Sequence, residues 1–442
     1  MKPSFYNIII ENTKQHETII YNSLYGSMTI FDNLEYILVK EIMDKPNDVI
    51  GNDKKIIKSL LAQKYLVDDD LDEKAIIENR KKKGMKDHNR LDLIIMPTLD
   101  CNFNCIYCYE EKEKGKMSDE TVNSLLKWMN IEIPKFKLVW LSWFGGEPLM
   151  AFDIIEKLTP LANQIASEHG VEIINHITTN GYLLTREKIL KMIELKIYNY
   201  QITIDGIAET HNKLRPLKDG RGSFERVFKN IIELVSIDSQ IKVTLRINFN
   251  HTNLYSVPEL LSMFDEKYRS QLRLTLEPIF GSCEYNATDN LITQDIASTV
   301  SSYLKMAAEM GYDITIGKSA VETGKLVYCY AERENQYIIN YTGDCFKCSV
   351  YNFTQSNRVG FFNNDGFVKE KEKWNAWMDF PLFDDVCRSC KYLPLCMGGC
   401  RKTRIQNRNN GSACSLIPSN AAYVLKQVAY NEFQNFVIKD VL

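Results

Sequence analysis

Hydrophobic positions in residues 1–86 follow two patterns in turn. Residues 5–11 and 18–31 are rich in β-branched and aromatic residues, with Gly26 as a turn candidate, so they predict two or three short strands. Asp32 can cap a following helix, because Glu35 stands three residues on and apolar residues repeat at helical spacing at Leu34, Ile37, Leu38 and Ile42. A second helix is predicted over Ile56, Ile57, Leu60 and Leu61. This order favours a winged-helix-like module.

From residue 87 to residue 315, apolar runs alternate with helical segments, which is typical of βα units around a parallel sheet. The six candidate strands are 91–96, 138–144, 171–178, 200–204, 242–249 and 272–276. Six repeats predict an α/β fold, a partial (β/α)6 barrel. The basic run at residues 80–86 could be a patch for an acidic partner, but we interpret it as a solvated linker and place a domain boundary there.

Residues 316–442 form the third predicted domain. This part of the chain is expected to be rich in loops, and eight of the twelve cysteines lie there. Metal sites, more than a continuous hydrophobic core, stabilise regions of this kind.

Composition and charge narrow the functional classes. Hydrophobic residues make up 45% of the chain and charged residues 25%, which argues against global disorder. The formal charge of -3 leaves no basic excess for a phosphate backbone or an anionic membrane, so neither nucleic acid nor a membrane is an expected partner. Residues 1–11 lack the features of a signal peptide, and no window approaches eighteen consecutive apolar residues. We therefore expect a cytoplasmic protein.

Cysteine usage is unusual for such a compartment, because stable disulfides are rare in reducing surroundings. Eleven of the twelve cysteines fall into close groups, as ligation of a metal or an iron-sulfur cluster requires. The exception, Cys283, is interpreted as a buried small apolar residue.

The first group, Cys101, Cys105 and Cys108, has the spacing C-x3-C-x2-C and follows the predicted strand 91–96. It therefore lies in the first loop at the carboxyl-terminal mouth of the barrel, where the active sites of barrel enzymes lie. Three thiolates can bind three irons of a [4Fe-4S] cube and leave the fourth iron open to a small molecule. A zinc site would need a fourth ligand, which this loop does not obviously supply.

The loop Cys101-Asn-Phe-Asn-Cys105-Ile-Tyr107-Cys108 resembles the cluster loop of radical S-adenosylmethionine (SAM) enzymes. The resemblance implies that the open iron binds SAM, that SAM is cleaved to a 5'-deoxyadenosyl radical, and that this radical abstracts hydrogen. It makes Cys101, Cys105 and Cys108 the catalytic cluster ligands. Residues 145–148, Gly-Gly-Glu-Pro, resemble the segment that holds the methionine ammonium of SAM.

The same resemblance assigns further residues to the SAM pocket. These comprise Tyr107 near the adenine, Gly145, Gly146, Glu147 and Pro148 after the second strand, and Thr179, Asn180, Asp205, Arg246 and Asn248 on the later strands. Plain turn chemistry is the alternative for the Asn-Gly and Asp-Gly pairs, which favour turns by themselves.

The C-terminal cysteines resemble the SPASM domain, which carries two auxiliary [4Fe-4S] clusters in peptide-modifying radical SAM enzymes. The resemblance assigns Cys329, Cys348 and Cys400 to a nearer cluster, and Cys387, Cys390, Cys396 and Cys414 to an outer one, for three clusters in all. Cys345 departs from the pattern: we favour it as a fourth ligand of the nearer cluster, while the alternative is an open iron that binds a substrate thiolate. Two structural zinc sites remain a further alternative.

The N-terminal module resembles the recognition element of enzymes that mature ribosomally synthesised peptides (RiPPs), which binds a leader peptide by strand addition. A packing extension without substrate contact is the alternative. The resemblance implies a maturase that forms thioether crosslinks in a precursor peptide and takes electrons from a donor such as ferredoxin or flavodoxin. Carbon-carbon crosslinking, sulfatase maturation by formylglycine formation, and a non-catalytic iron-sulfur scaffold stay open.

Overall fold

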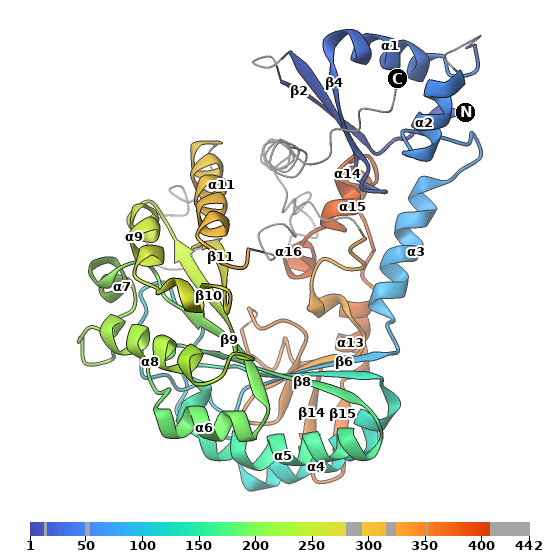
Figure 1. The fold of residues 1–442 in the computed structure, drawn as a ribbon. Coiled ribbons are helices and arrows are strands. Elements are labelled where there is room, and N and C mark those ends of the chain that lie inside the picture. Colours follow the sequence, from blue (N-terminus) through green and yellow to red (C-terminus); the bar gives the residue numbers. More distant parts are fainter. Residues whose placement is uncertain (13–15, 49–53, 280–293, 315–323, 351, 407–442) are drawn as a thin grey trace.

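The computed structural model describes residues 1–12, 16–48, 54–279, 294–314, 324–350 and 352–406, drawn in colour in Figure 1. Two positions singled out in the sequence, Cys283 and Cys414, lie outside these ranges. The described chain is a mixed α/β protein built around one large sheet, with a smaller sheet at the N-terminus.

The N-terminal module is an antiparallel sheet with two helices. Its strands β2 (Asn7–Asn12), β3 (Glu17–Asn22) and β4 (Met28–Asp32) pair in that order, while β1 (Lys2–Pro3) pairs with β5 (Leu66–Val67). The helices are α1 (Asn33–Asp44) and α2 (Lys54–Ala62). The predicted capping box is confirmed: Asp32 accepts hydrogen bonds from the backbone of Leu34 and Glu35, and Glu35 accepts one from Asp32 N. The strands and both helices match the sequence-based expectation.

The basic run differs from the expected solvated linker, because it belongs to helix α3 (Glu73–Met85). Lys81 of this helix is fully buried, and its Nζ lies 2.7 Å from Glu332 Oε1. The buried positions Glu73, Ile77, Lys81, Gly84 and Met85 have helical spacing, but Glu73 and Lys81 are charged and Gly84 has no side chain. Hydrophobic periodicity could not detect this buried face, because most of it is not apolar.

All six predicted barrel strands are confirmed, with ends that differ by a few residues. They are β6 (Arg90–Ile95), β7 (Leu138–Trp143), β8 (Glu172–Thr179), β9 (Ile197–Thr203), β10 (Lys242–Phe249) and β11 (Leu272–Pro278). The helices between and after them are α4 (Asp119–Glu132), α5 (Phe152–Glu168), α6 (Arg186–Glu194), α7 (Ala208–Leu214), α8 (Phe224–Ile237), α9 (Val257–Ser262), α10 (Glu266–Arg269) and α11 (Gln294–Glu309). Figure 1 shows them along the outside of the sheet.

The C-terminal region extends the barrel sheet, which the sequence did not predict. Strand β12 (Gln336–Ile339) pairs in parallel with β6, and the antiparallel strands β13 (Asp344–Phe346), β14 (Gly360–Asn363) and β15 (Gly366–Lys369) continue from it. The ten strands run in the order β11-β10-β9-β8-β7-β6-β12-β13-β14-β15. Short helices complete this region: α13 (Lys371–Met378), α14 (Asp385–Arg388), α15 (Leu393–Cys396) and α16 (Arg401–Gln406).

Side chains of the barrel strands alternate between a hydrophobic core and a polar interior. On β6, Leu91, Leu93 and Ile95 are fully buried in the core beneath the helices, whereas Arg90 and Asp92 line a cavity. This alternation follows from the two-residue repeat of a strand, and it gives the barrel a polar lumen. Among the helices of the described ranges, none is long and apolar enough to cross a membrane.

Candidate active site

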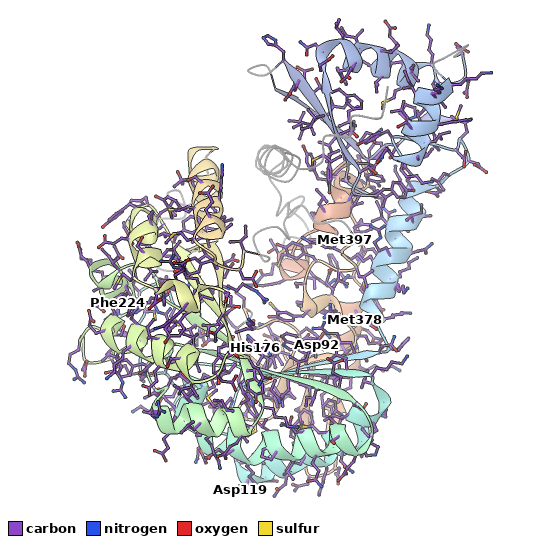
Figure 2. All side chains as sticks on the ribbon, viewed as in Figure 1. Asp92, Asp119, His176, Phe224, Met378 and Met397 are labelled. Carbon is purple, nitrogen blue, oxygen red and sulfur yellow. The ribbon has the colours of Figure 1, made fainter. Side chains whose placement is uncertain are left out.

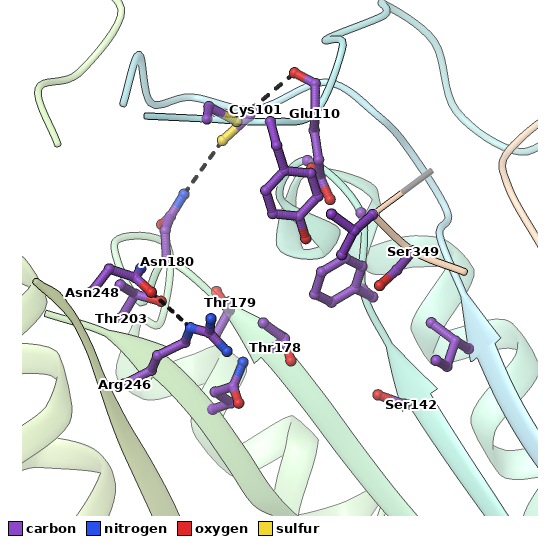
Figure 3. A pocket seen from close by; sticks show the side chains of 18 of the residues that line it. Cys101, Glu110, Ser142, Thr178, Thr179, Asn180, Thr203, Arg246, Asn248 and Ser349 are labelled. Carbon is purple, nitrogen blue, oxygen red and sulfur yellow. Dashed lines mark hydrogen bonds between the residues drawn. The ribbon is translucent and has the colours of Figure 1, made fainter. Parts of the chain in front are cut away.

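A cavity of about 630 Å³ lies within the partial barrel. Its upper wall is the loop after β6 together with the segments that follow β7 and β8, and its lower wall consists of inward-facing strand residues (Figure 3). The C-terminal region contributes Tyr330, Ser349 and Val350 to the same wall. The cavity therefore lies between the barrel and the C-terminal region.

The three cysteines of the loop after β6 all line this cavity, as the sequence predicted for the barrel mouth. Cys101 is buried, and its Sγ accepts hydrogen bonds from Phe103 N at 3.4 Å and from Asn180 Nδ2 at 3.8 Å (Figure 3). The loop is pinned to the end of α7, because Ile106 N donates to Leu214 O at 3.0 Å. This hydrogen bond holds the loop that carries the three thiols against α7.

Burial raises the pKa of the Cys101 thiol to about 12, and the carboxylate of Glu147 contributes after burial. Burial likewise raises the pKa of Cys105 and of Cys108. These thiols therefore lose their protons only when metal binding compensates the charge. Lys112 and Arg215 also line the cavity and provide positive charge beside the three sulfurs.

Three thiols from one loop line the same cavity. Within the described residues, no group of three His, Cys, Asp or Glu side chains is placed to hold a metal ion. Thiolates are the donors that iron-sulfur clusters take, so the residue types at this loop fit such a cluster. When bound, such a cluster supplies the electron for reductive chemistry on a ligand at its open iron.

The segment after β7 approaches the cysteine loop backbone to backbone. A Cβ on Gly146 would lie 2.3 Å from Asp100 O, and one on Gly145, which has a φ of 113°, would lie 2.3 Å from Thr98 O. Only glycine permits this contact. Both glycines line the cavity, as predicted.

Glu147 and Pro148 lie behind that wall and do not line the cavity. The fully buried carboxylate of Glu147 accepts hydrogen bonds from Thr179 Oγ1 and Asn180 N, both at 2.7 Å, and from Leu149 N at 3.1 Å. These bonds connect the segments after β7 and β8. Burial raises the pKa of the Glu147 carboxyl. Thr179 and Asn180 themselves reach the cavity. The expected contact of Glu147 with SAM stays a prediction.

Tyr107, Asp205 and Asn248, predicted from three separate segments, are joined in one network. The Tyr107 hydroxyl donates to the Asp205 carboxylate and accepts from Asn248 Nδ2 at 3.1 Å and from Arg215 Nη1 at 2.7 Å. Asp205 Oδ1 accepts from Asn248 N at 2.8 Å. Tyr107 and Asn248 line the cavity, whereas Asp205 supports them from behind. Arg246 lines it too, and its Nε donates to Asn248 Oδ1 at 2.9 Å.

Arg215 is a site residue that the sequence analysis missed. Its buried guanidinium lies over the Phe103 ring, 5.5 Å from the ring centroid, and 4.0 Å from the Asp205 carboxylate. It follows a short helix in a loop, where no motif or periodicity indicates a role. Only the return of this loop to the barrel mouth brings it to the site.

His176 and Glu110 were also missed. His176 lines the cavity from β8, and its Nδ1 lies 2.9 Å from Ser142 Oγ. Burial lowers the pKa of His176 to about 4, so its imidazole is neutral at pH 7. Burial raises the pKa of Glu110 to about 7, and its Oε1 has no hydrogen-bond partner. Strand alternation could have indicated that His176 faces the lumen.

The C-terminal cysteines form two neighbourhoods. Cys329 lies close enough to Cys348 and Cys400 for their charges to raise its pKa to about 12, after the larger effects of burial and Glu332. Cys387 lies near Cys396, which contributes to the raised pKa of the Cys387 thiol after burial and Asp384. The two predicted ligand sets stay predictions.

Cys345 has apolar surroundings. It is fully buried on β13 and packs against Val359 and Trp374. Tyr330 and Ser349, which directly follow Cys329 and Cys348, line the cavity, and their hydroxyl oxygens are 2.6 Å apart. Cys329, Cys345 and Cys348 do not line it themselves.

Comparison with known proteins identifies the barrel. Residues 95–259 match the Radical SAM superfamily. Residues 95–259 are therefore similar to radical SAM domains, a family that uses a [4Fe-4S] cluster and SAM, and the similar curated proteins include sulfatase-maturating enzymes and a PqqA peptide cyclase.

Two curated relatives illustrate the extent of this similarity. The chain is 28% identical over 170 residues to Fe-coproporphyrin III synthase of Methanosarcina barkeri, which is 38% of this chain and only 40% of that protein. It is 22% identical over 385 residues to the cysteine-type anaerobic sulfatase-maturating enzyme of Clostridium novyi, covering 77% of this chain and 99% of that enzyme.

Two solved structures share the fold. Native anSMEcpe with bound AdoMet and Kp18Cys peptide has a TM-score of 0.61 and 22% identity, covering 78% of this chain and 98% of that one. Streptococcus suis SuiB bound to precursor peptide SuiA has a TM-score of 0.52 and 16% identity, covering 93% and 97%. The chain therefore shares its fold with these two proteins.

Proposed function

We propose that this protein is a peptide maturase that uses its radical SAM domain to form thioether crosslinks in a ribosomally synthesised precursor peptide. The observation that carries the proposal is the composition of the cavity wall. Tyr330 and Ser349, which follow Cys329 and Cys348, line the same cavity as the three-cysteine loop. A substrate in this cavity would contact both cysteine regions at once.

We infer three [4Fe-4S] clusters: one at Cys101, Cys105 and Cys108, a nearer auxiliary cluster at Cys329, Cys348 and Cys400, and an outer one at Cys387, Cys390, Cys396 and Cys414. Thioether formation joins a cysteine sulfur to a carbon and removes two hydrogen atoms from the peptide. The carbon loses one of them as a hydrogen atom, which a fragment of SAM takes up. The thiol loses the other as a proton and an electron, and a nearby auxiliary cluster is a suitable acceptor of that electron.

The N-terminal module supports a peptide substrate with a leader. Strand β4 is an edge strand of the small sheet, and helix α1 follows it directly. Leu34 and Ile37, one helical turn apart on α1, are 79% and 54% exposed. An edge strand beside exposed apolar side chains suits strand addition by an extended peptide. The likeness to SuiB, whose solved structure contains a precursor peptide, covers more of this chain than the likeness to anSMEcpe does.

Cys345 bears on the chemistry of the nearer auxiliary cluster. Its apolar surroundings favour the alternative in which it is not a ligand, because a ligand has to face the other three thiols. We propose that Cys345→Ser retains the iron content of the wild type, whereas Cys348→Ser loses the nearer cluster. Equal iron loss in both variants would restore Cys345 as a ligand.

Sulfatase maturation is the second candidate, because the chain spans nearly the whole length of a sulfatase-maturating relative. The experiment that separates the candidates is an anaerobic incubation of the reconstituted enzyme with SAM, a reductant and the small peptide encoded beside its gene. A thioether product lacks two hydrogen atoms, and its crosslinked cysteine resists alkylation. A carbon-carbon product has the same mass but an alkylatable thiol, and formylglycine loses the sulfur. Formylglycine on a sulfatase peptide, with no change in the neighbouring peptide, would overturn the proposal.

A further inference from the structure

A buried histidine lies behind the cavity wall on helix α7. His211 is fully buried and does not line the cavity. Phe224 packs edge-on against its ring, with the ring centroids 5.8 Å apart, and Figure 2 labels Phe224 close to the place of α7 in Figure 1. A buried imidazole needs protein partners for both of its ring nitrogens, because water does not reach them. The partners of His211 therefore show which groups it holds in place.

Both ring nitrogens of His211 have a partner. The backbone N–H of Asp205 donates to Nδ1 at 3.1 Å, and Ser223 Oγ lies 3.0 Å from Nε2. Because a backbone amide can only donate, Nδ1 is the acceptor, so Nε2 carries the proton and donates it to Ser223. Burial, and after it the charge of Arg215, lowers the pKa of His211 well below its ordinary value. The imidazole is therefore neutral at pH 7, with its proton on Nε2.

Ser223 connects His211 to Arg215. The serine hydroxyl donates its one proton to Arg215 O at 2.7 Å, so its oxygen can accept from His211. Arg215 Nη1 donates to the Tyr107 hydroxyl at 2.7 Å, and that hydroxyl donates to the Asp205 carboxylate. The hydrogen bonds thus close a ring, which we call the Tyr107 ring: Tyr107, Asp205, His211, Ser223 and Arg215.

Only part of the Tyr107 ring faces the cavity. Tyr107 and Arg215 line the cavity, whereas the other three members lie behind its wall. Arg215 Nε is buried without a hydrogen-bond partner, so the guanidinium keeps a donor that the protein does not satisfy. Asp205, His211 and Ser223 are fully buried, where an unpartnered polar group is costly and hydrogen bonds reinforce one another. Displacing one member should therefore displace its neighbours in the ring.

We propose that His211 and Ser223 are positioning residues for SAM binding: they hold Asp205 and Arg215 so that the Tyr107 hydroxyl and the Arg215 guanidinium keep their places on the cavity wall. The inference rests on the proposed function, because it takes SAM to bind in this cavity. His211 and Ser223 themselves do not line the cavity, so both act through the members of the ring that do.

The test is the dissociation constant for SAM, measured by equilibrium dialysis on the anaerobically reconstituted full-length protein. Ser223→Ala removes the hydroxyl that joins His211 to Arg215, and we expect the constant to rise about tenfold. Ser124→Ala is the matched control, because Ser124 is a buried serine of α4 outside the ring. It should leave the constant unchanged.

A double variant distinguishes a shared positioning role from two separate structural defects. Tyr107→Phe opens the same ring as Ser223→Ala, so the two changes together should raise the constant only about tenfold. Independent effects would multiply to about a hundredfold. Tyr107→Phe combined with Ser124→Ala should match Tyr107→Phe alone. A hundredfold rise in the double variant, or an unchanged constant in Ser223→Ala, would overturn the inference and leave the proposed function intact.

A second measurement on the wild type does not depend on the folding of any variant. Nitrogen NMR of the isotope-labelled protein distinguishes the two neutral tautomers of an assigned histidine from the charged ring. At pH 7, His211 should be neutral with its proton on Nε2. A proton on Nδ1, or a charged ring, would overturn the inference, because Nδ1 could not then accept from Asp205. A wild type that binds no SAM would contradict the proposed function itself.

Discussion

The two cysteine regions of this chain are built in opposite ways. Cys101, Cys105 and Cys108 come from one short loop after β6, and all three line one cavity. Cys329, Cys348 and Cys400 come from segments separated by up to 71 positions in the numbering, and the helix that packs behind them, α3, belongs to the N-terminal half. The first proposed ligand set is local in sequence, while the second would depend on tertiary contacts.

The difference predicts which property of each region a substitution affects. A local loop on a parallel sheet keeps its geometry as long as the barrel folds, because β6, the strand that precedes it, is paired with β7 on one side and β12 on the other. The C-terminal set is supported by single contacts between distant segments, such as Lys81 with Glu332 and Arg401 with Glu332. Substitutions in the first region should affect chemistry, and those in the second should affect assembly.

The largest effect is expected from replacing the local ligands. Cys101→Ala, Cys105→Ala and Cys108→Ala together should abolish 5'-deoxyadenosine formation, because no protein ligand would remain for the cluster at the cavity. The measurement is chromatography of the reaction products. The matched control replaces Cys387, Cys390 and Cys396, which should lower iron content but retain SAM cleavage. Residual reductive cleavage in the first variant would mean that the loop is not the catalytic centre.

Lys81→Met should destabilise the second region by about 3 kcal/mol, because among the described residues the buried Glu332 carboxylate would keep a single cationic partner, Arg401 at 3.4 Å. Urea unfolding of the iron-loaded protein would measure the change. Lys82→Met, on the exposed face of α3, is the control and should have little effect. Equal stability of the two variants would show that the buried ion pairs are not what supports this region.

His176 predicts a pH dependence for the first region. Its folded-state pKa of about 4 lies below the ordinary value of 6.5, so the unfolded chain takes up the proton first as the pH falls. Wild-type stability should therefore drop by about 2 kcal/mol between pH 7 and pH 5 on account of this group. His176→Gln should remove that part of the slope, whereas His88→Gln at an exposed site should retain it. Identical slopes in all three proteins would place His176 in a more solvated environment.

The smallest effect concerns the network around Tyr107. Tyr107→Phe leaves the Asp205 carboxylate and Arg215 without their common partner, so the dissociation constant for SAM should rise on the order of tenfold, or about 1.4 kcal/mol. Equilibrium dialysis with labelled SAM would measure it. Tyr182→Phe is the control, since Tyr182 packs on Phe103 without lining the cavity. An unchanged constant in Tyr107→Phe would separate this network from SAM binding.

Much of the fold follows from local patterns. The capping box at Asp32 and the six barrel strands were predicted because their signals lie within a few residues of one another. Helix α3 was missed because Lys81 looks solvent-exposed by residue type and is buried by its contact with Glu332. Strand β12 was missed because four residues carry little periodicity, and its pairing with β6 is a contact over about 240 positions.

The sequence by itself determined the alternation of strands and helices and the local chelating loop at Cys101, Cys105 and Cys108, because these depend on spacing along the chain. Only the tertiary structure decided that Arg215 reaches the cavity and that Lys81 of α3 is buried against Glu332. Those placements depend on which distant segments pack together to bury apolar surface, and residue spacing carries no record of that choice.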